Sequence, residues 1–189
     1  MNIMMMAGGN KMNIMMMAGV AVGLFVGLIL VVILFKFANT NHRMKTEYDE
    51  RQKEVRGRAY MAAFYTMMVF EVIFMLLSIG DITLPIADYS LHFIGIAAAC
   101  TVLGGYCIWH DVYWGLNNDH KRYYIVFAVC IVLNIIPIVG ASKSNTWKNA
   151  DGRIGIPALN VMVITMMAIL GIELIVKGLI DRNRNDEED

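Results

Sequence analysis

The segment AGVAVGLFVGLILVVILFKFA, residues 18–38, decides the fold of this chain. It carries no charged residue before Lys36. A helix of about 20 mostly apolar residues crosses the ~30 Å hydrocarbon core of a bilayer, and backbone polar groups in lipid must be paired within the helix. The apolar core is longer than that of a signal peptide, and no small-residue cleavage site follows it. We therefore expect a retained transmembrane helix.

Four more stretches of similar character follow. The chain has 189 residues, of which 58% are hydrophobic, and its mean hydropathy is +0.55. Soluble domains are about 45–50% apolar. The predicted fold class is therefore all-α, a polytopic membrane protein with a bundle of five transmembrane helices. A single integral membrane domain, residues 1–189, should lie in the lipid bilayer, with the other four spans at 59–79, 91–109, 123–141 and 156–176.

The positions of lysine and arginine predict how the chain is threaded. Seven basic residues lie between residues 36 and 58, whereas residues 80–90 contain none. Cytoplasmic loops carry an excess of lysine and arginine, so the first connection should be cytoplasmic. Counting onward puts twelve basic residues inside and four outside, the four being Lys11, Lys143, Lys148 and Arg153. The amino terminus should face outward and the carboxyl terminus should be cytoplasmic.

The total charge excludes several classes of function. Sixteen basic and sixteen acidic residues give no net charge, which argues against nucleic-acid binding and against polybasic lipid binding. The three cysteines lie in apolar runs without CxxC spacing, so they predict neither a disulfide framework nor a zinc site. Nucleophile elbows, phosphate-binding glycine loops and paired carboxylates within one span are missing from the sequence. We expect a non-enzymatic protein with no catalytic residues, no metal site and no cofactor.

A methionine-rich octet occurs twice at the start of the chain, at residues 1–8 and 12–19. Thioether sulfurs bind Cu(I), so Met4–Met6 and Met15–Met17 suggest copper handling as one hypothesis. Methionine also fills irregular apolar gaps, and no histidine or cysteine accompanies these residues, which favours packing. We interpret the repeat as a short tandem duplication, in which either Met1 or Met12 is the true start.

Three glycines in the first span form GxxxGxxxG: Gly19, Gly23 and Gly27. This spacing places them on one face of the helix and allows another backbone to approach closely. The face is expected to pack either against another helix of the same chain or against the first helix of a second copy. The second alternative would make the protein a homo-oligomer.

Two connections are predicted to lie on the cytoplasmic side. EYDERQKEVRGRAY, residues 47–60, should form a helix that leads into the second span, with charged pairs spaced by four residues. CIWHDVYWGLNNDHKRYY, residues 107–124, is rich in aromatic residues typical of a membrane interface. Together the two connections suggest either a solvated surface or a docking face for a protein partner. The candidate docking residues are Asp49, Glu50, Arg51, His110, Asp111 and Asn117.

Polar residues within the spans point to a second kind of site. Glu71 lies about 18 Å from the inner end of its predicted helix, and an ionised carboxylate in hydrocarbon is costly. We expect Glu71 to face the bundle interior and to be hydrogen-bonded there. Glu173, by contrast, is expected to reach water near Lys177. Similar counts along the other spans place four polar side chains in one layer near the midplane: Glu71, Thr101, Asn134 and Thr165.

The stretches YDERQKEVRGRAY and CIWHDVYWGLNNDHKRYYIVF resemble a family of uncharacterised small multi-pass bacterial membrane proteins, a domain of unknown function. The resemblance covers residue 48 to the fifth span and implies a location in the bacterial cytoplasmic membrane, without an assigned activity. It rests on Asp49, Glu50, Arg51, Gln52, Arg56, Gly57 and Tyr60, and on Trp109, Asp111, Tyr113, Asn117, Arg122 and Tyr123.

Three hypotheses for function follow. The first is a membrane protein that docks a cytosolic or membrane partner through its two inner connections, with a regulatory role. The second is a small transporter or transporter subunit that uses intramembrane Glu71 and Asn134. The third is a copper-handling protein that uses the methionine-rich amino terminus.

Overall fold

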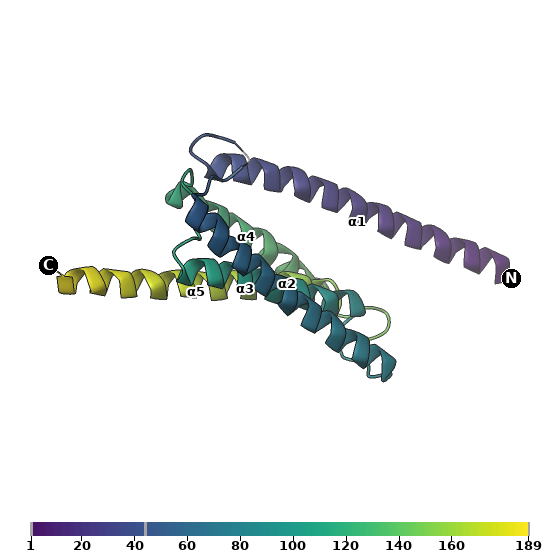
Figure 1. Cartoon of the computed structure of the whole chain (residues 1–189). Coiled ribbons are helices and arrows are strands. Elements are labelled where there is room, and N and C mark those ends of the chain that lie inside the picture. Colours follow the sequence, from purple (N-terminus) through teal and green to yellow (C-terminus); the bar gives the residue numbers. More distant parts are fainter. Residues whose placement is uncertain (1, 44, 189) are drawn as a thin grey trace.

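The computed structural model is all-helical and describes residues 2–43 and 45–188. Side chains are described for residues 18–19, 21–23, 25–43, 45–119 and 121–183. Within these residues there are five helices, three isolated β-bridges and no strand. The predicted all-α class is confirmed, and each helix contains a stretch long and apolar enough to cross a membrane. The helices are α1 (Asn2–Ala38), α2 (Glu50–Ile79), α3 (Asp88–Trp109), α4 (His120–Ser144) and α5 (Pro157–Glu188), shown in Figure 1.

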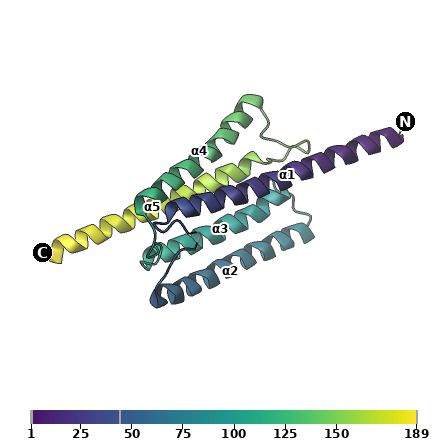
Figure 2. The ribbon, with the colours of Figure 1, turned by 90° about the horizontal axis from the view of Figure 1, so that it is seen from above.

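Four helices pack side by side in an order that differs from their order in the chain. α2 contacts α3, α3 contacts α5, and α5 contacts α4, so the last helix lies between the third and the fourth. Figure 2 shows this row from above, with α2 at one side and α4 at the other. Among the described residues, α1 contacts α4 alone, and Figure 1 shows it diverging from the bundle toward its amino terminus.

The helix ends are set by recognisable local signals. The side chain of Asp49 accepts a hydrogen bond from the backbone of Gln52, and the Gln52 side chain accepts one from the backbone of Asp49, which forms a capping box. Asp119 caps α4 in a similar way. Pro157 is the first residue of α5, where its missing N–H costs nothing. These caps explain why α2 begins before its apolar core, as predicted for residues 47–60.

The outer surface of the helices is apolar. Phe25 is 65% exposed, Ile136 61% and Ile79 72%. Contiguous apolar surface on this scale is unusual for a monomer in water, whereas it suits side chains that face lipid. α3 is the most enclosed helix, since it packs against both α2 and α5.

Glycines allow α3 to approach α5 closely. A Cβ atom on Gly104 would lie 2.6 Å from Leu170 Cδ2, and one on Gly105 would lie 2.7 Å from Glu173 Oε2. The Glu173 carboxyl is therefore packed against α3, and Oε2 is buried without a hydrogen-bond partner among the described residues. Lys177, one turn farther along, pairs with Asp111 and Asp181, and Glu173 is half-buried.

The three glycines of α1 do not mediate packing within the chain. A Cβ atom added to Gly19, Gly23 or Gly27 would meet no described atom within 4 Å. The expectation that this face packs against another helix of the same chain is therefore not met. α1 leaves the bundle before these residues could reach a neighbour.

The connections lie at two opposite ends of the bundle. One end, which we call the Asn117 end, contains residues 39–49 and 110–119, which join α1 to α2 and α3 to α4. The other, the Arg153 end, contains residues 80–87 and 145–156, which join α2 to α3 and α4 to α5. At the Arg153 end the two connections are joined by backbone hydrogen bonds, such as Ala87 N to Ile154 O at 2.9 Å.

Candidate binding cavity

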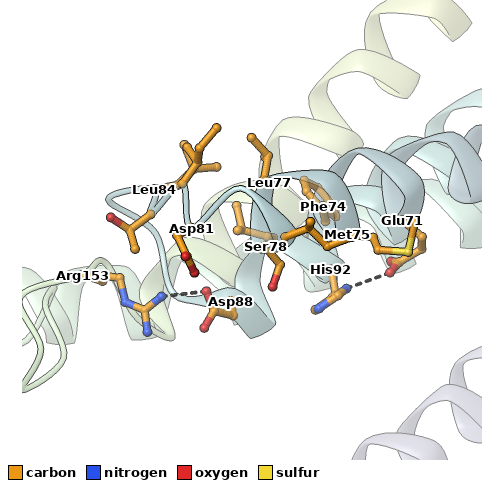
Figure 3. A pocket seen from close by; sticks show the side chains of 14 residues that line it. Glu71, Phe74, Met75, Leu77, Ser78, Asp81, Leu84, Asp88, His92 and Arg153 are labelled. Atoms are coloured by element: carbon orange, nitrogen blue, oxygen red, sulfur yellow. Dashed lines mark hydrogen bonds and ion pairs between the residues drawn. The ribbon is translucent and has the colours of Figure 1, made fainter.

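A cavity of about 650 Å³ opens at the Arg153 end. Figure 3 shows side chains from four parts of the chain around it. The last turns of α2 contribute Glu71 and Phe74, the α2–α3 connection contributes Asp81, the start of α3 contributes Asp88 and His92, and the α4–α5 connection contributes Arg153. Most of the remaining wall is apolar: Met75, Leu77, Ile79, Ile82, Leu84 and Leu91.

Two ionisable side chains from neighbouring helices meet in this cavity. Glu71 Oε2 of α2 lies 2.9 Å from His92 Nδ1 of α3, as Figure 3 shows. The Phe74 ring lies edge-on to the imidazole, with centroids 6.0 Å apart, and helps to orient it. Both α2 and α3 are long and apolar enough to cross a membrane. The Glu71–His92 pair is therefore a polar contact between two apolar helices.

The close approach of α2 and α3 makes this pairing possible. Gly95 is buried, and a Cβ atom there would lie 3.1 Å from Phe70 Cβ, next to Glu71 in the chain. A larger residue at position 95 would push the helices apart at the level of the pair. Gly95 therefore sets the distance between the two backbones.

Glu71 lines the cavity instead of being enclosed in the bundle. Its side chain is 41% exposed and that of His92 is 57% exposed. Glu71 lies eight residues before Ile79, the end of α2, or about 12 Å along the helix. The expectation that Glu71 is hydrogen-bonded is confirmed, and its partner lies on the neighbouring helix α3, but the side chain is only partly enclosed because it lines the cavity.

Arg153 closes one side of the cavity mouth with two ion pairs. Its guanidinium lies 2.6 Å from Asp88 Oδ1 and 2.7 Å from Asp151 Oδ2. Hydrogen bonds from Arg153 hold the pKa of the Asp151 carboxyl below its ordinary value. Because two carboxylates share one guanidinium, the positive charge of Arg153 is already neutralised by Asp88 and Asp151.

Asp81 presents a further carboxyl to the cavity. It lies in the turn after α2 with φ of 51°, a left-handed conformation that aspartate tolerates better than most residues. Among the described residues, its carboxylate makes no hydrogen bond and no ion pair, and it is exposed. With all carboxyl groups ionised, three carboxylates and one guanidinium line the cavity, so its net charge is negative whether or not His92 is protonated.

The predicted polar layer is not formed as one group. Asn134 donates to Cys130 O at 2.8 Å within α4, and α4 does not contact α2 in the described part of the chain. Thr101 and Thr165 each bond to a carbonyl one turn earlier in their own helix, and both line a groove between α3 and α5. Residue counts along a helix give depth but not direction around the helix, which explains the error.

At the Asn117 end, the two connections are held together by a network around one buried asparagine. Asn117 is 6% exposed, and its Oδ1 accepts a hydrogen bond from Glu47 N at 2.8 Å. Its Nδ2 donates to Lys45 O and to Asn41 Oδ1 at 3.1 and 3.2 Å. The side chain of Asn118 donates to Asn39 Oδ1 at 2.7 Å. Asn117 therefore serves the fold and cannot be a docking contact as predicted.

The other candidate docking residues differ in their exposure and in their contacts. Asp49 caps α2, and Glu50 and Arg51 are exposed. His110 stacks on Tyr106, with ring centroids 4.0 Å apart, and Asp111 pairs with Lys177 at 3.1 Å. Burial raises the pKa of the nearby Tyr113 phenol. Glu50 and Arg51 thus remain available to a partner.

Metal binding finds no support in the described residues. Histidine, cysteine, aspartate and glutamate nowhere form a group of three that could hold a metal ion in that part of the chain. The side chains of Met4–Met6 and Met15–Met17 lie outside the described residues, so the copper hypothesis stays a prediction.

His92 is a candidate site residue that was not predicted from the sequence. The available signal was that Glu71 and His92 both lie in the half of their helix next to the same short connection. Antiparallel helices joined this way bring such residues to similar depth, so an ionisable partner for Glu71 could have been sought on α3.

Comparison with protein-family models, with curated proteins and with solved structures finds no match to this chain. The resemblance carried by residues 48–60 and 107–127 stays a prediction. The class that the fold defines is an all-helical protein with five candidate membrane spans, and its function has to be inferred from the geometry of its sites.

Proposed function

We propose that the protein is a small, non-enzymatic membrane transporter, or a transporter subunit, that binds a solute in the cavity at the Arg153 end. The observation that carries this proposal is the Glu71–His92 pair. Ionisable side chains within membrane-spanning segments are costly and commonly belong to substrate or proton pathways. This pair also lines a cavity, so a solute can reach it.

The pair supplies a chemical means of coupling. A carboxyl and an imidazole that share a hydrogen bond can hold one proton between them, and a charged solute beside them changes which protonation state is favoured. Solute binding and proton release are then linked. Asn134, which the sequence grouped with Glu71, has no part in this proposal because its helix does not contact α2 among the described residues.

The transport proposal predicts the effect of replacing Glu71. Protein in sealed liposomes that contain a pH-sensitive dye should show proton movement when the right member of a solute panel is added outside. Glu71→Gln keeps the shape and hydrogen-bonding capacity of the side chain but cannot ionise, so it should abolish the solute-dependent signal while leaving thermal stability nearly unchanged.

Glu54→Gln is the matched control for this experiment. Glu54 lies on the same helix and pairs with Arg58 at 2.6 Å, near the Asn117 end. We expect this variant to transport like the parent. Solute-dependent proton movement that persists in Glu71→Gln would contradict the proposal, as would equal losses in both variants.

We also propose that the Asn117 end faces the cytoplasm, in the cell membrane of a bacterium. The twelve-to-four distribution of lysine and arginine supports this orientation. The amino terminus is then outside, the carboxyl terminus is cytoplasmic, and the cavity opens to the outside.

This orientation predicts a labelling pattern. In a background without the native cysteines, Lys148→Cys at the Arg153 end should react with an impermeant maleimide in intact cells. Leu116→Cys lies at the Asn117 end, at a position that is 67% exposed, and should react only after the cells have been permeabilised. Labelling of Leu116→Cys in intact cells would reverse the proposed orientation and would place the cavity mouth in the cytoplasm.

Docking of a cytosolic or membrane partner, with a regulatory role, is the second candidate function. The observation in its favour is that the network around Asn117 joins two connections into one fixed surface that presents Glu50 and Arg51. A photocrosslinker at position 51 should capture a stoichiometric partner in native membranes, whereas one at position 148 should not. Equal capture at both positions would argue against a specific docking face.

The glycine face of α1 supports a homo-oligomer as a further proposal. Because Gly23 has open space around it within the chain, Gly23→Ile should leave the stability of the monomer nearly unchanged. If two copies pair through α1, the same change should separate them, because a branched side chain keeps the backbones apart. Size measurement in mild detergent distinguishes the cases: a parent that is already monomeric would contradict pairing.

A further inference from the structure

We propose that the cavity at the Arg153 end selects lipophilic organic cations, that is, a positively charged group on an apolar body. The inference rests on the cavity being the binding site proposed above, and it adds the chemical class of the ligand. Three observations support it: the size of the cavity, its apolar walls, and the distribution of charged side chains along it.

Size and wall composition fit a small organic molecule. Ligand pockets in proteins commonly measure about 300–1,000 Å³, and this cavity measures about 650 Å³. Phe74, Met75 and Leu91 provide apolar surface in the cavity wall. The ring of Phe74 also suits a cation, because its face carries partial negative charge.

The net negative charge of the lining disfavours an anion and favours a cation. Among the described residues that line the cavity, Arg153 is the one side chain with a permanent positive charge, and it is already paired with Asp88 and Asp151. Asp81 stands at the mouth without an ion pair among the described residues. Figure 3 places Asp81 and Asp88 at one side of the cavity and Glu71 at the other, so carboxylates are present at both sides of a bound cation.

An inorganic cation is a poorer fit than an organic one. Divalent metals need several oxygen or nitrogen ligands that converge on one point. The described residues contain no group of three potential ligands that could hold a metal, and Glu71 is directed to His92. An organic cation has a diffuse positive charge and needs no coordination sphere. It can therefore bind between separated carboxylates and apolar walls.

The test uses two probes of nearly identical size and opposite charge, tetraphenylphosphonium and tetraphenylborate. The full-length protein is placed in nanodiscs of zwitterionic lipid, and saturable binding of each probe is measured above that of empty nanodiscs. We expect tetraphenylphosphonium to bind saturably and tetraphenylborate to bind at least tenfold more weakly. Equal binding of both probes would overturn the inference, because it would show an apolar site, such as one for an acyl chain, without charge selection.

Two variants assign the selectivity to the cavity. Glu71→Gln and Asp81→Asn should each weaken tetraphenylphosphonium binding by about tenfold, because each removes one negative charge near the bound cation. Asparagine keeps the left-handed turn at position 81, so the second variant should fold even if the first does not. Glu54→Gln should bind like the parent. Unchanged binding in Asp81→Asn and Glu71→Gln, or no saturable cation binding at all, would overturn the inference.

The binding experiment and the transport experiment can fail independently of each other. Cation binding without solute-dependent proton movement would sustain this inference and contradict transport. Proton movement driven by a neutral or anionic solute, without cation binding, would sustain transport and overturn this inference.

Discussion

Replacing Gly104 with leucine should destabilise the helix bundle by about 2–3 kcal/mol, the upper range for overpacking a well-packed interior. Even a single Cβ atom at this position would lie 2.6 Å from Leu170 Cδ2 and 3.1 Å from Leu170 Cδ1. Leu170 is 7% exposed, so it has little room in which to change rotamer. α3 and α5 would have to separate, and the contacts on both sides of position 104 would weaken.

Gly171 provides a matched control on the opposing helix. It is also a glycine within a candidate span, but a Cβ atom there would meet no described atom within 4 Å. Gly171→Leu should therefore leave stability nearly unchanged. The measurement is reversible unfolding of both variants in mixed micelles with increasing denaturing detergent. If both variants unfolded at the same detergent fraction as the parent, close packing of α3 on α5 would be refuted.

Replacing Asn117 with leucine should cost about 3 kcal/mol, although the two side chains are similar in size. The buried amide accepts one hydrogen bond and donates two, all to the connection between α1 and α2. Each bond contributes roughly 1 kcal/mol, and a buried donor left without a partner adds a desolvation penalty of about 1–3 kcal/mol. Leucine would remove all three hydrogen bonds and would leave the backbone N–H of Glu47 without this partner.

The effect of Asn117→Leu should also be local and visible by proteolysis. Residues 39–49 would lose their attachment, so trypsin should cleave after Arg43 and Lys45 much faster than in the parent. Asn41→Leu is the control: Asn41 is exposed and can be replaced by water in its contact with Asn117, so the change should cost less than about 1 kcal/mol. Unchanged cleavage in Asn117→Leu would show that the network does not hold the connection.

The fold could be predicted to a large extent because membrane spans depend on properties that are local in sequence. Length and apolar content identify each span, and residues such as Asp119 mark helix starts without reference to the rest of the molecule. The order of the helices in the bundle could not be predicted, because it depends on which faces are complementary. Gly104 and Gly105 gave no sign in the sequence that α5 would pack there.

The sites were harder to predict for two physical reasons. Depth follows from counting residues, but whether Glu71 meets Asn134 or His92 depends on how each helix is rotated and on its neighbours. Connections are harder still, since Asn117 looked like an exposed polar residue and became buried only through backbone groups of residues 45 and 47. Its partners lie about 70 positions away in the chain, beyond the range of local patterns.

The position of α5 between α3 and α4 has a consequence for biosynthesis. Chains are made from the amino terminus, and their early parts fold first. α2 and α3 can pair as a hairpin as soon as both have entered the membrane, but α3 and α4 make no direct contact in the described residues. Until α5 arrives, the close-packing face of α3 around Gly104 and much of α4 remain in contact with lipid or with the insertion machinery. The bundle can therefore close only after α5 has been synthesised and inserted, so the packing of α3 and α4 waits for residues 157–188.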